Sequence, residues 1–239
     1  MTQTADPLRL PPAFTLQDSA GCPFAEAQAQ AGALGAGTFF LRRAGGVLAM
    51  AVVLEPDEPL AAARRAFLLG IVALADALAA QCPPERPVRL LWPDTILFDK
   101  ARLGGGRLAV APGTAEDAVP DWLVFGAELL EARPGLQAPG QHPGSTSLSE
   151  EGFAPTERLI ESFASYLMLY VDRWQHEGAE SVLNRFLMRI DPPLLKGVRR
   201  IEGDRLVEIT PSGGGRRLGA LAEALTAPPG WRGEDGPQW

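Results

Sequence analysis

Proline and glycine divide this chain into short segments, and this punctuation constrains the fold more than any other feature of the sequence. The 239 residues include 26 glycines and 22 prolines, and both residue types interrupt helices and strands. Between the breaks, six apolar runs have the length and composition of β-strands. They cover residues 38–42, 47–54, 88–92, 96–98, 102–110 and 122–130. The first two are joined through residues 43–46 and predict a β-hairpin.

Three other segments have the apolar spacing of helices. They cover residues 25–33, 59–81 and 156–190. The second is the clearest, with Arg64, Arg65 and Asp76 off its apolar stripe and Gly70 as its only weak point. The sequence Cys82-Pro83-Pro84 is expected to stop it.

The ends of the first helix also carry signals. Asp18 or Ser19 is expected to cap its start, and Gly35 and Gly37 are expected to end it. Together with Gly32 these glycines are spaced in the wrong order for a dinucleotide-binding fingerprint, and they follow a helix rather than a strand. We therefore interpret them as a helix C-cap.

The second half of the chain suggests a domain boundary. Gly178 divides the third helical segment in two, and Asp191-Pro192-Pro193 follows, where two prolines cannot continue a helix. Residues 132–147 are rich in Pro and Gly and predict a long surface loop. After the boundary, residues 197–209 predict another hairpin, and a glycine loop leads to a short element at 217–225.

Strands and helices alternate without a regular βαβ rhythm, which favours an α+β fold over a doubly wound sheet. We expect a mixed β-sheet with helices packed on it, formed by residues 1–190. A small β-rich C-terminal domain is expected at residues 191–239.

Composition excludes several function classes. A formal charge of −7 gives no electrostatic footprint for nucleic acid. Two cysteines and two histidines predict neither a disulfide framework nor a metal site. The chain starts without a secretory signal, and its most apolar stretch, residues 66–80, is too short to span a bilayer. We expect a cytoplasmic protein with no nucleic-acid or membrane partner.

The most informative stretch is residues 90–110, LLWPDTILFDKARLGGGRLAV. Its Trp-Pro-Asp, short strand, turn and glycine-rich strand resemble the biotin and lipoate protein ligases, which carry Trp-Pro-Asn-Asp, a hairpin and a Lys-x-x-Gly strand. Three further segments agree in order. Residues 37–40 resemble the family's Gly-Thr-Val-Val strand, 122–127 its apolar glycine-containing strand, and 145–153 its Thr-Ser-Leu-x-Glu-x-Gly segment. The resemblance covers about residues 14–190.

This resemblance implies a class II synthetase-type fold and a two-step reaction. A biotin-, lipoate- or octanoate-like carboxylate attacks ATP, usually with Mg²⁺, and a lysine of a biotinyl or lipoyl carrier domain then takes the acyl group. Such chemistry needs an apolar slot, backbone N–H groups near the carboxylate and cations near the phosphates. Gly104, Gly105 and Gly106 suit close approach of a ligand to a strand, the alternative being a bulge or kink. The pocket is expected over the sheet near them.

The chain also departs from the family pattern. The family's Gly/Arg-rich adenylate loop is reduced to a short hairpin, and its Asn-Asp pair is replaced by Asp94-Thr95. Its catalytic lysine aligns with Arg102, whose planar guanidinium cannot place a compact charge at the same point. The chain has only two lysines, and Lys100 lies either on the strand face of Arg102 or in the turn before it.

The candidate catalytic residues are therefore Arg102 and Lys100. The candidate ligand-binding residues are Asp94, Thr95, Gly104, Gly105, Gly106, Arg107, Arg42, Arg43 and Thr38. Several have an alternative structural interpretation: the arginines as solvated charges, and Asp94 as a turn residue. Trp92 and Trp122 are interpreted as core residues rather than ligand-stacking ones.

Two functions are predicted from this pattern. The first is a ligase that activates the acid with ATP and transfers it to a carrier lysine. The alternative is a non-catalytic ligand-binding or regulatory relative that has lost adenylation. A third route, acyl transfer without ATP, would use Lys100 or the Cys82 thiol, which is otherwise inert packing. The oligomeric state is left open between monomer and homodimer.

Overall fold

The computed structural model describes residues 8–239, except residues 84, 137, 139, 154, 212, 213 and 235. The predictions made for residues 1–7 and for Pro84 lie outside this part, as do two residues of the predicted loop at 132–147. Within the described part, no helix is long and apolar enough to cross a membrane.

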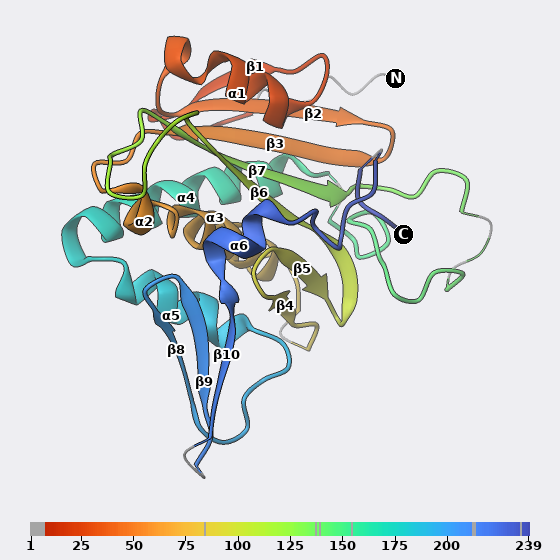
Figure 1. Ribbon diagram of the computed structural model, residues 1–239. Helices are drawn as coiled ribbons and strands as arrows, with labels where there is room; N and C mark the ends of the chain where they lie inside the picture. Colours follow the sequence, from red (N-terminus) through yellow and green to blue (C-terminus); the bar gives the residue numbers. More distant parts are fainter. Residues whose placement is uncertain are drawn as a thin grey trace.

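The centre of the molecule is a seven-stranded mixed sheet (Figure 1). Its order is β1-β2-β3-β7-β6-β5-β4, and all neighbours are antiparallel except β1 and β2. All six predicted strands are present, and β1 is an additional short polar strand. The strands are β1 (Thr15–Asp18), β2 (Thr38–Ala44), β3 (Val47–Leu54), β4 (Val88–Leu91), β5 (Thr95–Phe98), β6 (Ala101–Val110) and β7 (Leu123–Leu130).

Helices cover both faces of this sheet (Figure 1). The main core lies on the face packed against α3 (Ala66–Ala79), α4 (Glu157–Glu177) and α5 (Glu180–Arg189), where Phe67, Phe125 and Phe163 are fully buried. The opposite face is partly covered by α1 (Pro23–Leu34), which packs on β2, β3 and β7 through a smaller core. The predicted α+β fold is confirmed.

The cap predicted for α1 is wrong. The residue at the N-cap position is Cys22, with no side-chain hydrogen bond, and Ser19 instead donates to Glu26 Oε2 at 2.5 Å. The predicted end is correct, because Gly35 has a φ of 76° and donates its N–H to Ala31 O.

The segment predicted as one helix at 59–81 forms α2 (Leu60–Ala63) and α3, separated by a turn. Asp76, off the apolar stripe, is buried rather than solvated. Its carboxylate accepts hydrogen bonds from the Tyr170 hydroxyl and the Arg189 guanidinium, and thus ties α3 to α4 and α5. A buried charge is tolerable only with such partners.

The C-terminal region is a three-stranded sheet of β8 (Val198–Glu202), β9 (Arg205–Ile209) and β10 (Gly215–Ala220), followed by α6 (Leu221–Thr226). The division into two domains at about residue 190 stays a prediction. Beyond α6, the described residues of 228–239, here called the C-terminal tail, return to the large sheet and end beside β7 (Figure 1).

Candidate ligand-binding site

One row of residues crosses the large sheet on the face that carries α1. Arg42 pairs with Ala49, and Ala49 pairs with Glu128. Glu128 pairs in turn with Gly105, and Gly105 pairs with Thr95. Residues paired across neighbouring strands lie about 5 Å apart and share a face. The row therefore aligns predicted ligand-binding residues of β2, β5 and β6.

The three glycines of β6 have different surroundings. A Cβ on Gly104, where φ is 155°, would lie 2.1 Å from Glu128 O, and the pairing with β5 is irregular at this point, as the bulge interpretation predicts. A Cβ on Gly106 would lie 2.5 Å from Ile71 Cδ1, on the opposite face. Only Gly105 opens onto the predicted site, where a Cβ would lie 2.4 Å from Asp94 O and from Trp231 Nε1.

Arg102 and Arg107 both reach this face, and neither is a freely solvated charge. Arg102 donates to Gln238 O through Nε at 3.3 Å and Nη2 at 3.1 Å. Arg107 forms an ion pair with Glu128, and its guanidinium lies 4.3 Å from the centre of the Phe24 ring. Two cations thus stand on either side of Gly105.

Asp94 lies in the turn between β4 and β5, as its structural interpretation predicts. Its Oδ1 accepts from the Thr95 hydroxyl at 2.9 Å, and its carbonyl accepts from Gly106 N at 2.9 Å. Burial raises the pKa of the Asp94 carboxyl, and the Thr95 hydroxyl and the Trp231 indole oppose that shift. Across the described ranges, no three His, Cys, Asp or Glu side chains are grouped so that they could hold a metal ion.

Three predicted site residues lie elsewhere. Lys100 is exposed in the turn between β5 and β6, with a φ of 70°. Arg43 points to the opposite face, which carries α3, α4 and α5, because adjacent strand residues face opposite ways. There it pairs with Glu157 at 2.5 Å. Thr38 donates its hydroxyl to Gly35 O at 2.9 Å, at the end of α1. Arg42 is exposed at the β2 end of the row.

Two residues of this face were not anticipated from the sequence. Glu128 is 6% exposed and accepts from both Arg107 and Arg232, the latter at 3.0 Å. Its position as the only charged residue in the apolar run LVFGAELL could have indicated from the sequence that it is a buried, functional carboxylate. Trp231 is fully buried, although it comes from a Pro- and Gly-rich segment that has no periodicity to reveal this.

Residues 10–188 match the model of the biotin/lipoate A/B protein ligase family. This chain belongs to that family. None of the curated proteins matches it in sequence.

Solved structures show the same fold. A biotin protein ligase-like protein of unknown function from a Silicibacter species has 27% identity and a TM-score of 0.71, covering 90% of this chain and 98% of that one. The Aquifex aeolicus biotin protein ligase has 15% identity and a TM-score of 0.64, covering 86% and 95%. Its complex with biotin and ATP has 14% identity and a TM-score of 0.62, covering 85% and 95%.

In this biotin/lipoate ligase family member, β2 and β3 are joined only by Gly45 and Gly46. Both have positive φ, at 64° and 78°. A tight two-residue hairpin turn needs positive φ at both central residues, which glycine adopts readily. Two residues cannot fold over a bound nucleotide.

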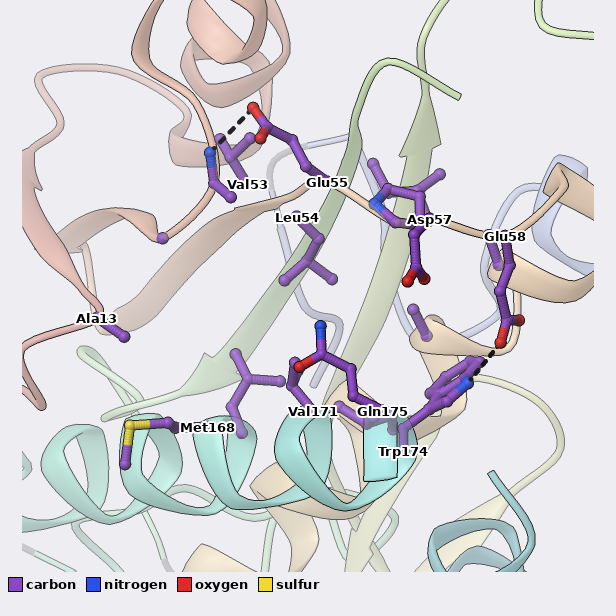
Figure 2. Close-up of a pocket in the computed structure, with 18 of the residues that line it drawn as sticks. Ala13, Val53, Leu54, Glu55, Asp57, Glu58, Met168, Val171, Trp174 and Gln175 are labelled. Carbon is purple, nitrogen blue, oxygen red and sulfur yellow. Dashed lines mark hydrogen bonds between the residues drawn. The ribbon is translucent and has the colours of Figure 1, made fainter. Parts of the chain in front are cut away.

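A cavity of about 300 Å³ lies where β2 begins and β3 ends, next to the predicted site residue Thr38 but away from Gly105 and Arg102 (Figure 2). Leu54, Val171 and Trp174 contribute to its apolar wall. Glu55 and Glu58 stand at its edge, where Glu55 accepts from Ala36 N at 3.2 Å and Glu58 accepts from Trp174 Nε1 at 3.1 Å (Figure 2).

A second cavity, of about 310 Å³, is lined by residues of α3, α5 and β4 and by Cys82. The Cys82 thiol donates towards Ala79 O and Arg86 O, and burial raises its pKa. A raised thiol pKa reduces the fraction of the nucleophilic thiolate. Both its position and its chemistry count against acyl transfer by Cys82.

Proposed function

We propose that this family member binds a biotin-, lipoate- or octanoate-like carboxylate over Gly105, on the α1 face of the sheet. The observation that carries the proposal is the convergence of Arg102, Arg107 and the Gly105 backbone, which has no side chain of its own, on that face. Two guanidinium groups suit a carboxylate, because charge-assisted pairs with Arg are among the strongest hydrogen bonds in proteins. A glycine backbone allows an apolar ligand to lie flat on the strand.

We further propose that the protein binds the acid without adenylating it. The turn at Gly45 and Gly46 is too short to enclose a nucleotide. Arg107 and Arg232 share the single carboxylate of Glu128, so this cluster keeps one net positive charge, which suits one carboxylate better than the phosphates of ATP.

Calorimetric titration of the full chain with biotin, lipoate and octanoate, each with and without ATP and Mg²⁺, tests this proposal. We expect one acid to bind and ATP to give no heat and no change in melting temperature. Replacing Arg102→Ala should weaken binding of that acid by about 10-fold or more, since hydrogen bonds to charged groups contribute about 1.5–3 kcal/mol. Arg43→Ala, on the opposite face, is the matched control and should leave the affinity unchanged.

A second candidate function is the complete ligase reaction with a carrier lysine as acceptor. Family membership favours it, together with a cation, Arg102, on the site face at the position of the family's catalytic lysine. Pyrophosphate release that depends on both ATP and the acid would establish this function and overturn the non-catalytic proposal. Release that is abolished in Arg102→Ala and retained in Arg43→Ala would assign the activity to this site.

A further inference from the structure

The C-terminal tail covers the same surface to which the carboxylate ligand is assigned above. The indole of Trp231 is fully buried against Gly105, with Nε1 2.4 Å from where a Cβ would stand. Any larger residue at position 105 would exclude this ring. The space over the Gly105 backbone, where the ligand is expected to bind, is therefore already occupied by the indole ring of Trp231.

The polar groups of the site are also engaged by the tail. Arg102 donates twice to the main-chain carbonyl of Gln238, and Glu128 accepts from Arg232. A neutral carbonyl is a weaker partner for guanidinium than a carboxylate is. A carboxylate ligand would therefore offer Arg102 a better acceptor than the tail does.

The buried position of Trp231 does not provide a well-formed hydrogen bond for its indole N–H. This N–H makes no hydrogen bond within normal distance and angle limits, although it is close enough to the Asp94 carboxyl to lower the pKa of that group against the effect of burial. A buried donor with so poorly aligned a partner costs free energy. The ring is thus a good apolar fit and a poor polar one.

The rest of the tail is a narrow segment bonded largely to itself. Gly233 N donates to Gly236 O at 2.8 Å, and Gln238 N donates to Trp231 O at 3.0 Å. Gln238 and Trp239 are exposed, and the hydrogen bonds to Arg102 are at the surface. Such a segment can leave the sheet without unfolding β6 or β7, because its own bonds remain intact when it moves.

We propose that the C-terminal tail is an intramolecular occupant of the ligand site, with the Trp231 indole on Gly105, and that the carboxylate ligand binds only when the tail leaves. This inference rests on the proposed function, because it assigns regulation to the same surface. Occupation by the tail lowers the apparent affinity in proportion to the fraction of open molecules. A tail that is closed in nine of ten molecules weakens binding about 10-fold.

The test compares acid binding by the full wild-type chain and by three single variants of the tail. Trp231→Ala removes the occupant and should tighten binding of biotin, lipoate or octanoate about 10-fold or more. Arg232→Gln removes the ion pair to Glu128 together with the hydrogen bonds from Arg232 Nη1 to Gly233 O and Glu234 O. It leaves the core intact and should tighten binding to a smaller extent. Trp239→Ala is the matched control, because this indole is 42% exposed and contacts His142 instead of Gly105.

Hydrogen exchange on the wild-type chain provides a readout that does not depend on whether Trp231→Ala folds. Saturation with the acid should increase amide exchange across residues 228–239 and decrease it across β6. Increased protection of the tail would overturn the proposal, because the tail would then be a wall of the occupied site.

The two proposals fail in different ways. Acid binding of equal strength by wild type, Trp231→Ala and Arg232→Gln would overturn the role of the tail and leave the proposed ligand site standing. No binding of any of the three acids by wild type or by either variant would overturn the proposed function itself, and the tail proposal with it.

Discussion

Arg42 and Arg43 are adjacent in the chain but lie on opposite faces of the sheet. Arg42 belongs to the row that includes Glu128 and Gly105, whereas Arg43 binds Thr156 and Glu157 at the start of α4. Strand geometry allows no other outcome, since successive side chains alternate between the faces. A prediction that placed both arginines at the ligand therefore had to be wrong for one of them.

Arg43 thus has a structural role that can be measured through pH. The hydrogen bond from Arg43 is the largest cause that lowers the pKa of Glu157 below its usual 4.5. A carboxyl with a lowered pKa in the folded state stabilises the protein above about pH 4.5 and loses that contribution as pH falls through the folded value. Glu157→Gln should therefore flatten the loss of stability between pH 5 and pH 3, by about 1 kcal/mol or less for a partly exposed pair.

Urea unfolding at a series of pH values checks this expectation. Arg43→Gln should flatten the same pH range, and adding Glu157→Gln to it should produce little further change, because both variants break one pair. An unchanged pH dependence in Glu157→Gln would show that the pair contributes nothing in solution.

At the residue scale, the sequence predicted site chemistry only where local pattern decides it. The glycine-rich strand and its two arginines could be recognised because they are consecutive in β6. Glu128 and Trp231 reach Gly105 from other parts of the chain, and periodicity carries no information about such long-range contacts. The same applies to Asp76, whose partners Tyr170 and Arg189 come from helices far along the chain.

At the element scale, nearly every helix and strand was predictable, because Pro and Gly mark their ends. One exception is the single short element predicted at 217–225, which is strand β10 followed by helix α6. Two others share a cause. Strand β1 has only four residues, TLQD, and is held by parallel pairing with β2 rather than by its own propensity. The turn between α2 and α3 lies where Arg64 pairs with Glu116, outside the helix. Tertiary contacts decide both.

Gly70 and Gly32 provide an element-scale prediction, since both lie inside helices. In an open helix position, Gly→Ala stabilises by roughly 0.5–1 kcal/mol. Gly32 fits that case, because its Cβ would meet nothing nearer than Trp122 Nε1 at 4.0 Å. At Gly70 the Cβ would lie 2.5 Å from the Phe125 ring, so Gly70→Ala should destabilise by about 1–3 kcal/mol through overpacking.

Thermal and urea unfolding of the two variants checks the opposite signs. A control measures the free energy of unfolding of Gly70→Ala, of Phe125→Leu and of the double variant. In the double variant, the smaller side chain at position 125 should recover part of the stability lost through Gly70→Ala. Stabilisation by Gly70→Ala would contradict the close packing of α3 on β7.

At the scale of the whole molecule, the C-terminal sheet is a separate sheet that shares the hydrophobic core of the large one. Leu206 and Leu221 are both fully buried in that main core. Trp231 then adds a second attachment, on the other face of the large sheet. A region of about 50 residues is at best marginally stable alone, because a short chain buries a small fraction of its surface. We therefore expect the chain to unfold in one cooperative transition, even if the predicted boundary near residue 190 is a true domain boundary.

Leu206→Ala tests that expectation against Leu195→Ala, a matched control in the same region that is 93% exposed. Truncating a buried leucine costs about 2–5 kcal/mol, whereas an exposed one changes stability by about 0.5 kcal/mol or less. If the two parts are coupled, Leu206→Ala lowers the urea midpoint seen by circular dichroism and by tryptophan fluorescence equally, because the large sheet loses its stability together with the small one. If they are independent, the variant shows an early transition confined to residues 191–239, and the large sheet keeps the wild-type midpoint. Only the coupled result would allow a change in the stability of the C-terminal sheet to alter how tightly the tail packs on Gly105.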